Sequence, residues 1–332
     1  MKLNKVLRKI RENHRDFYWW RDNIIYYTLR MFERNNGDYI LDEDWDNLII
    51  LDDCRYDIFR IIYLERKMIG KLQKRISRGT YTVDFLVENF SRCDRYNDIV
   101  YITANPYVDM YLNGKFYKII SVWKTGWNEK YKTVLPSTVM YAAINALKKY
   151  PRKRFIIHFL QPHHPYLSLD FEDLLMEKIR DAAIGKIQNI KEERAKSLLA
   201  IYSSSLYASV PIDCIIEAYI NNLRIVMPYV ELLLSELPGR TIVTSDHGES
   251  FGDKINPLLP IKFYGHGFTR LRSLILVPWL VVDEEFKAFY RREERKRKNK
   301  REIAEVEKKL CSERQRIREL MKLLRLREFK CI

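Results

Sequence analysis

Five of the six histidines lie in two short segments of the chain. One segment, TIVTSDHGE, places Asp246 and His247 side by side after an apolar run, and His266 follows in YGHG. The other, HFLQPHHPY, contains His163 and His164. Carboxylate oxygens and imidazole nitrogens are ligands that zinc and manganese accept. Because an aspartate and a histidine at the end of one strand can both reach the same ion, this pattern predicts a divalent metal site.

A second acidic group follows the apolar run NLIIL at residues 47–51. Such a run is typical of a buried parallel strand, and open α/β sheets bind ligands at the C-terminal ends of their strands. Asp52 and Asp53 come directly after the run, and Arg55 follows closely. Arg55 either contacts an anionic substrate or forms an ion pair with Asp57, and both interpretations stay open.

Three motifs together resemble a known family. The sequence DHGES at residues 246–250, followed by GHG at 265–267, resembles the C-terminal metal signature of the alkaline phosphatase superfamily. It is most similar to the sulfatase-like and phosphoethanolamine-transferase branches. DWDNLIILDDCRYD resembles the first strand of archaeal sulfatase-like proteins, and HFLQPHHPY resembles their His-Pro loop. The resemblance implies an α/β fold like that of alkaline phosphatase, with a mostly parallel central sheet and helices on both faces.

The same resemblance implies a nucleophile that a metal ion holds in place. The transferase branch carries Gly-Thr-x-Thr, and the matching segment here is GTYT, which points to Thr82, with Thr80 as the second candidate. A threonine at a helix start is otherwise a simple N-cap. Asp52, Asp246 and His247 would bind the ion with Thr82 as the fourth ligand. Four such ligands suit zinc, with manganese or calcium as alternatives.

His163 and His266 are placed opposite this metal by the resemblance. They would bind phosphoryl oxygens, protonate the leaving group or hold a second metal. A second metal of the phosphatase type also needs an Asp-x-x-x-His pair, which the sequence lacks, so one metal is expected. His164 and Arg55 are the candidates for substrate binding, and His164 is otherwise a packed loop residue. Asp53 either assists at the metal, as paired acids do in sulfatases, or supports a ligand from behind or faces solvent.

The expected reaction is the hydrolysis or transfer of a phosphate ester or phosphodiester through a phosphothreonine intermediate. The alternative is a sulfatase, whose nucleophile is made from Cys or Ser within Cys/Ser-x-Pro-x-Arg. Cys54, Cys93 and Ser77 all lack a proline two residues later, which disfavours it. The expected substrates are phosphorylated or sulfated small molecules, lipid head groups or glycans.

Composition and patterning suggest three segments in the 332 residues. The catalytic domain is expected at 36–284, after a basic, aromatic helix at 1–35 that packs on the body or lies on a membrane surface. Of the net charge of +15, residues 285–332 supply +9, with 18 basic and 9 acidic residues. This tail has a heptad seam, typical of a coiled coil, and would fold back on the body or pair in a homodimer. A third interpretation is a non-catalytic protein that binds nucleic acid or anionic lipid through the tail, although nucleic acid is not the expected partner.

The five cysteines form no CxxC pair, and the start of the chain has no apolar stretch of the kind found in secretory signals. Both observations favour a cytoplasmic protein, with peripheral membrane contact left open. No apolar run approaches the ~20 residues of a spanning helix. Strands are expected at 47–51, 99–102, 117–122, 155–160, 241–244 and 273–282, and the longest helices at 172–207 and 215–237.

Overall fold

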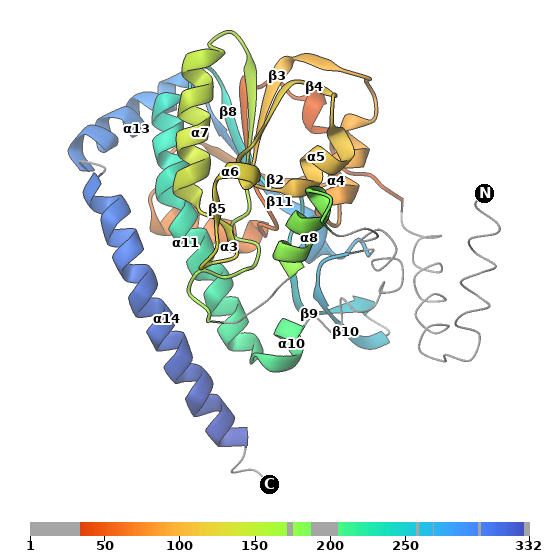
Figure 1. The fold of residues 1–332 in the computed structure, drawn as a ribbon, viewed down its shortest axis with the longest axis vertical. Coiled ribbons are helices and arrows are strands. Elements are labelled where there is room, and N and C mark those ends of the chain that lie inside the picture. The colour runs from red at the N-terminus through yellow and green to blue at the C-terminus, as the bar shows by residue number, and fades with distance from the viewer. Residues whose placement is uncertain are drawn as a thin grey trace, which may run out of the picture.

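The apolar runs of the sequence become the strands of one central sheet. The computed structural model describes residues 34–170, 175–186, 205–256, 259–267, 269–297 and 300–328. Within these residues the sheet contains β1 (Asn47–Leu51), β2 (Lys71–Ile76), β3 (Tyr96–Thr103), β4 (Phe116–Ser121), β7 (Arg154–Phe159), β8 (Thr241–Thr244) and β11 (Leu276–Val282). They stand in the order β2-β11-β8-β1-β7-β3-β4 (Figure 1).

Most neighbouring strands of this sheet run parallel. β1 pairs in parallel with β7 on one side and β8 on the other, and β3 pairs in parallel with β7 and β4. β11 is antiparallel to both β8 and β2. All five residues of β1 are buried, as expected for a strand in the middle of a covered sheet. The predicted mostly parallel sheet is therefore confirmed.

Helices cover both faces of the sheet, as predicted. Figure 1 shows α7, α11 and α13 on one side and α4 and α5 on the other. The helices are η1 (Ile40–Asp42), α3 (Tyr56–Glu65), α4 (Thr82–Phe90), α5 (Pro106–Leu112), α6 (Val122–Thr125), α7 (Pro136–Lys149), α8 (Leu175–Ala183), α10 (Ser205–Ser209), α11 (Ile212–Glu236), α12 (Arg272–Ile275), α13 (Glu284–Arg297) and α14 (Lys300–Glu328).

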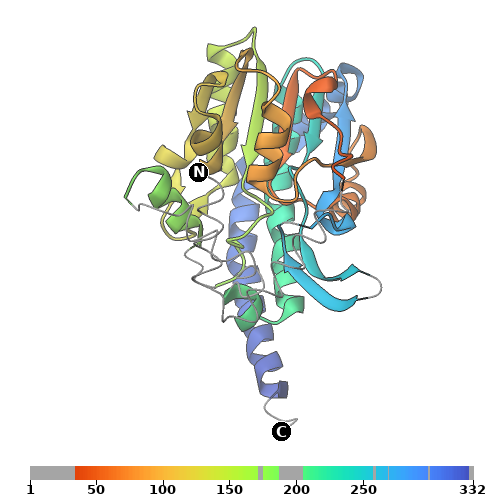
Figure 2. The same ribbon diagram turned by 90° about the vertical axis from the view of Figure 1, so that its right-hand side faces the viewer.

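Two small antiparallel hairpins lie outside the central sheet. One pairs β5 (Trp127–Asn128) with β6 (Thr133–Val134). The other pairs β9 (Ser250–Asn256) with β10 (Leu259–Gly265) and projects from the body, as Figure 2 shows. This second hairpin occupies the segment between DHGE and YGHG, where no strand was expected from the sequence. It brings Gly265 opposite Ser250, and so returns the chain to the end of β8.

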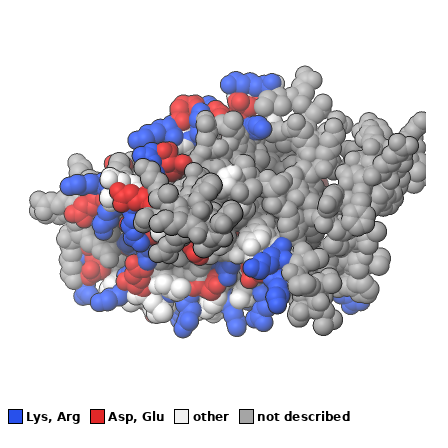
Figure 3. Space-filling model, turned by 90° about the horizontal axis from the view of Figure 1, so that it is seen from below, with Lys and Arg blue, Asp and Glu red and all other residues white. Residues whose placement is uncertain are grey.

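The tail after residue 284 forms two helices rather than one. α14 lies along α11 (Figure 1). Leu310 and Ile317, two members of the predicted heptad seam, are buried there. These seam residues therefore pack against the rest of the same chain. This is one of the alternatives that the sequence left open. Seen from below, acidic and basic side chains are interspersed over the described surface (Figure 3).

Two sequence predictions fall largely on parts of the chain outside the described residues. Most of the expected N-terminal helix does, because residues 1–33 are not described. The expected helix at 172–207 is described only at α8 and α10. Among the residues that the structure does describe, no helix combines the length and the apolar character needed to cross a bilayer.

Candidate catalytic site

Hydrogen bonds tie the C-terminal ends of β1 and β8 together. The backbone N–H of Asp53 donates to Asp246 Oδ1 (3.0 Å), and that of Cys54 donates to Ser245 Oγ (2.7 Å). Asp53 adopts a left-handed backbone conformation with φ of 66°, which aspartate tolerates better than most residues. The two acidic segments found in the sequence therefore meet at one edge of the sheet.

Asp52, Asp246 and His247 form a buried group whose potential ligand atoms all lie within 4.8 Å of one another. Nε2 of His247 lies 3.8 Å from Asp52 Oδ1 and 3.3 Å from Asp246 Oδ2. All three side chains are at most 1% exposed. The structure thus brings together the three side chains that the sequence analysis assigned to one metal.

Each of the two carboxylates uses one oxygen within the protein and leaves the other without a partner. Asp246 Oδ1 accepts from the N–H groups of Asp53 and His247, and Asp52 Oδ2 accepts from Asn105 Nδ2. Within the part of the chain that the structure describes, Asp52 Oδ1 and Asp246 Oδ2 are buried and have no hydrogen-bond partner. Buried carboxylate oxygens are costly when nothing compensates them, so the group fits a divalent cation.

The contacts of the His247 ring fit the same ion position. Nδ1 lies 3.0 Å from the carbonyl oxygen of Gly248, an arrangement that places the ring proton on Nδ1 and leaves Nε2 as the lone-pair atom. Asp53, His247 and His266 form a second group of potential ligands. In that second group the contact to His247 is through Nδ1, which lies 3.3 Å from Asp53 Oδ1. Because Nδ1 already contacts a carbonyl, the first group is the better ion site.

Thr82 is the first residue of α4 and lies beside this group. Its Oγ1 is 3.5 Å from His247 Nε2, and the side chain is buried. Gly79 lets the loop before α4 pass close to Phe85 in the first turn of that helix. A Cβ at position 79 would come within 2.5 Å of Phe85. Thr80 differs, because its N–H and hydroxyl lie 3.2 and 3.5 Å from Asp84 Oδ2. Of the two threonines, Thr82 is the one with a contact to the predicted metal ligands.

His163, His164 and His266 lie next to one another, beside the group of Asp52, Asp246 and His247. The ring of His163 stacks on His164 with centroids 4.2 Å apart, and it lies 5.1 Å from the ring of His266. The centroids of His266 and His247 are 4.6 Å apart. Burial, reinforced by His164, lowers the pKa of His163 well below its usual value. The structure therefore brings His163 and His266 together, with His266 next to the ring of His247.

Asn222 of α11 fixes the loop that carries His163. Its Nδ2 lies within 3.1–3.2 Å of the carbonyl oxygens of Pro162, His163 and Pro165. Its Oδ1 accepts from the N–H of Leu167 (2.8 Å). Asn222 is fully buried, so one amide side chain anchors most of this loop to the long central helix.

Glu249 orients His266. Oε2 of Glu249 lies 2.8 Å from His266 Nδ1, and Oε1 accepts from the hydroxyl of Tyr207 (2.8 Å). Burial alone would lower the pKa of His266, but the Glu249 carboxylate raises it above the usual value. Burial alone would raise the pKa of Glu249, but His266 holds it below the usual range. The pair therefore favours a charged imidazolium beside the metal group.

The three aspartates differ in acidity because their surroundings differ. Burial and the neighbouring Glu249 carboxylate raise the pKa of Asp53 well above its usual value. Burial and Asp52 also raise the pKa of Asp246. For Asp52, burial acts in the same direction, but His158, helped by other imidazoles, holds the pKa below its usual range. This crowding of buried carboxyl groups is what a cation would relieve.

Arg55 is engaged within the protein. Its Nε and Nη2 donate to Asp57 (2.9 and 2.7 Å), which is one of the two alternatives posed from the sequence. Its Nη1 also donates to the carbonyl oxygen of Glu249 (3.1 Å) and lies 3.7 Å from Asp253. Substrate contact by Arg55 would therefore require its guanidinium to leave or share these partners.

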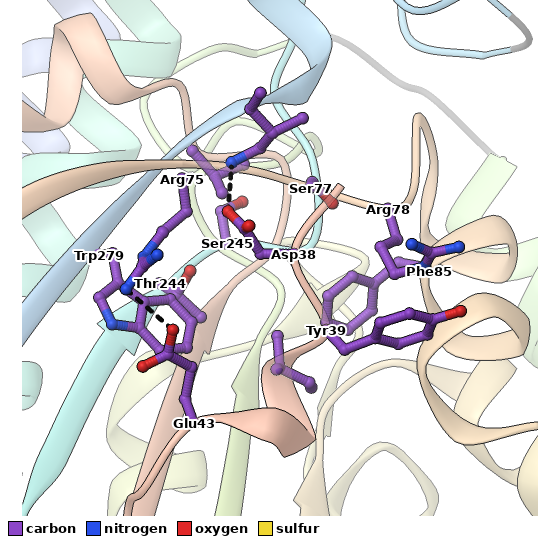
Figure 4. Close-up of a pocket in the computed structure, with 13 residues that line it drawn as sticks. Asp38, Tyr39, Glu43, Arg75, Ser77, Arg78, Phe85, Thr244, Ser245 and Trp279 are labelled. Carbon is purple, nitrogen blue, oxygen red and sulfur yellow. Dashed lines mark hydrogen bonds and ion pairs between the residues drawn. The ribbon is translucent and has the colours of Figure 1, made fainter. Parts of the chain in front are cut away.

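A pocket behind the ends of β2 and β8 is distinct from the metal group. It is lined by residues that include Ser77 and Ser245 (Figure 4). Its polar groups pair with each other, since Arg75 binds Glu43 at 2.8 Å and Asp38 accepts from the N–H of Ile76 at 3.2 Å. None of the clustered carboxylates and imidazoles lines this pocket, so it is separate from the candidate metal site.

No role was assigned from the sequence to several residues of the site. Glu249 stands within the DHGES motif, so its position could have suggested a role. Asn222 and Tyr207 lie in ordinary helical stretches. His158 lies on β7, with its side chain fully buried. Only the three-dimensional contacts reveal what these side chains do.

Two solved structures resemble this fold. The soluble domain of lipooligosaccharide phosphoethanolamine transferase A from Neisseria meningitidis aligns with a TM-score of 0.41 and 13% identity, over 73% of this chain and 77% of that chain. The C-terminal periplasmic domain of EcEptC from Escherichia coli, in complex with zinc, aligns with a TM-score of 0.42 and 13% identity, over 76% and 77%. No protein-family model and no curated protein matches the chain. Likenesses this remote carry no inference about the reaction, which must come from the site itself.

Proposed function

We propose that this protein is a metal-dependent enzyme that cleaves or transfers phosphate esters, with Thr82 as its nucleophile. The observation that carries the proposal is the convergence of unpartnered oxygens of Asp52 and Asp246 with His247 Nε2, beside the Thr82 hydroxyl. A bound divalent cation supplies the acidity that keeps this hydroxyl deprotonated and offsets charge on the phosphoryl oxygens. Zinc suits the set of two carboxylates, one imidazole and one hydroxyl.

The side chains of the site divide the reaction into two steps. Thr82 Oγ1 attacks phosphorus, the bond from phosphorus to the leaving oxygen breaks, and that oxygen takes a proton from His266. Nδ1 of His266 is held by Glu249, so Nε2 is the atom that exchanges the proton. Water or an acceptor alcohol then attacks the phosphothreonine, returns a proton to His266 and releases Thr82. His163, whose ring centroid lies 5.1 Å from that of His266, lines the place beside it where the substrate would bind.

The charge of the site favours phosphodiesters over phosphate monoesters. Asp52, Asp246 and Glu249 are buried within it and offset the charges of a bound cation and of His266. The guanidinium of Arg55 is engaged by Asp57. A monoester dianion would bring one more negative charge into these surroundings than a diester monoanion. We therefore infer a higher kcat/KM for a diester than for the matching monoester.

The test compares threonine variants on a pair of aryl substrates. The purified protein is supplied with zinc or manganese and assayed with bis-p-nitrophenyl phosphate and p-nitrophenyl phosphate. Thr82→Ala should lower activity by at least about 100-fold. Loss of an essential nucleophile can lower kcat by about 10^6-fold. Thr80→Ala is the matched control and should retain it, because its hydroxyl faces Asp84. Equal turnover by wild type and Thr82→Ala would refute the nucleophile.

Two further measurements separate the alternatives. Mass spectrometry after rapid acid quench should locate a p-nitrophenyl phosphoryl group on Thr82 during turnover of the diester. An aryl sulfate tested in parallel checks the sulfatase alternative, which requires a modified Cys or Ser. Cys54 is a poor candidate for that modification because its thiol is fully buried, and burial raises its pKa well above the usual value.

A further inference from the structure

A polar network lies behind Asp52, on the side away from the predicted metal ion. Nδ2 of Asn105 donates to Asp52 Oδ2 at 2.7 Å, and Asn105 is 2% exposed. The amide is itself fixed, because its Oδ1 accepts from the N–H of Tyr107 and caps α5 (2.9 Å). Its backbone N–H donates to Thr103 Oγ1 (2.9 Å). With its oxygen used by the cap, the amide nitrogen is the atom directed at Asp52.

A second arm of the network reaches the same oxygen through the sheet. His158 Nε2 lies 3.5 Å from Asp52 Oδ2, within ion-pair distance but without hydrogen-bond geometry, and His158 Nδ1 lies 3.0 Å from the hydroxyl of Tyr101. Both side chains are fully buried, on the adjacent strands β7 and β3. An imidazole that presents an N–H to a carboxylate through Nε2 accepts through Nδ1, so the Tyr101 hydroxyl donates to it. The Asp52 carboxylate, which can only accept, sets this tautomer of His158, and the Tyr101 hydroxyl, which can donate or accept, is compatible with it.

We propose that Asn105, His158 and Tyr101 form a clamp that fixes the Asp52 carboxylate by Oδ2 and so presents Oδ1 to the cation. The proposal rests on the metal site of the proposed function. The three side chains are positioning residues, since they contact neither the ion position nor the nucleophile directly. Partners that orient a metal ligand typically change metal affinity by about 10- to 100-fold when they are removed. The clamp therefore predicts a loss of metal affinity from residues outside the ligand set.

Two conservative variants test the clamp without a change of fold. Asn105→Ser keeps an oxygen that can cap α5 and removes the donor to Asp52. Tyr101→Phe removes only the hydroxyl and keeps the ring packed on Phe90 and Phe116. Tyr96→Phe is the matched control on the same strand, because the Tyr96 ring stacks on Phe116 at the far end of β3.

The measurement is zinc affinity, by competition with a chromogenic chelator, together with the visible spectrum of the cobalt-substituted protein. Asn105→Ser should weaken zinc binding by about 10- to 100-fold, and Tyr101→Phe by several-fold, in line with the usual effect of such partners. Both should alter the cobalt bands, and Tyr96→Phe should do neither. Melting of the metal-free proteins shows whether the fold is kept, and loss of stability alone would not change the cobalt spectrum.

The outcomes distinguish the clamp from the enzyme. Unchanged zinc affinity and an unchanged cobalt spectrum in both clamp variants would overturn the clamp and leave the enzyme standing. Weakened zinc binding in a protein that turns over no phosphate ester would support the clamp and refute the proposed function. A wild-type protein that binds no zinc would refute both.

Discussion

Replacing Asp246 by asparagine should abolish metal binding and leave the fold intact. The two oxygens of Asp246 have different surroundings. Oδ1 accepts from two backbone N–H groups, and Oδ2 has no hydrogen-bond partner among the described residues. An asparagine can keep its oxygen at the first position, and its NH2 group then occupies the second. The reverse orientation would place the NH2 group against two N–H donors. The variant thus presents a donor to the cation where the wild type presents a ligand.

The expected magnitude follows from linkage between binding and folding. Zinc at about 100 times its Kd stabilises a protein that binds it only when folded by about 2.7 kcal/mol. For a domain of this size, each kcal/mol raises Tm by roughly 2–4 °C, so zinc should raise Tm of the wild type by roughly 5–10 °C. Asp246→Asn should show no such rise. Without metal it should melt at or above the wild-type temperature, because burial and Asp52 make the native carboxylate costly to ionise.

The assay is differential scanning fluorimetry with and without zinc, at one protein concentration. Asp109→Asn is the matched control, because Asp109 accepts from Ser121, Trp123 and Lys124 and belongs to neither potential metal group. It should melt earlier than the wild type but keep the full rise with zinc. A rise of the same size in Asp246→Asn would show that the ion binds elsewhere, and the site as described would be wrong.

Two other predictions concern α13 and α11. Burial lowers the pKa of Lys287 from 10.5 to about 8. The unfolded chain binds more protons between these values, so this group makes the protein more stable as pH rises from about 8 to 10.5, by about 3 kcal/mol at 1.4 kcal/mol per unit. Urea unfolding at both pH values should show that rise in the wild type and not in Lys287→Met. Asn222→Ala should lower kcat by about tenfold or more, with zinc affinity kept, because it frees the loop of His163. The same change in a His163→Ala background should have little further effect, and simple additivity of the two would refute this role.

The central strands could be predicted because they consist mostly of apolar and β-branched residues. NLIIL and TIVT are continuous apolar runs followed by acidic residues, and β1 and β8 match them residue for residue. β2 was missed because its sequence, KLQKRI, is mostly polar, as suits a strand at the edge of the sheet. The β9–β10 hairpin was missed because glycine and proline interrupt it.

The candidate ligand residues could be proposed from the sequence, and the groups behind them could not. Asp246 and His247 stand together in a motif, so their chemistry can be read from neighbours in the chain. The importance of His158 arises from Tyr101 and Asp52, which are brought beside it only by the pairing of β1, β7 and β3. Which oxygen of a carboxylate remains without a partner is likewise a property of the folded chain. Sequence can therefore propose the ion but not the arrangement that orients its ligands.

The place of β1 between β7 and β8 has a consequence for how the protein is made. Asn47 pairs with Phe155 on one side and with Thr241 on the other, so the first acidic segment leaves the ribosome long before either flanking strand. Until residue 247 has been synthesised, Asp52 has neither Asp246 nor His247 beside it. Pairings this distant in sequence form slowly. Cation uptake is therefore expected to be a late event in biogenesis, after the sheet has closed around its central strand.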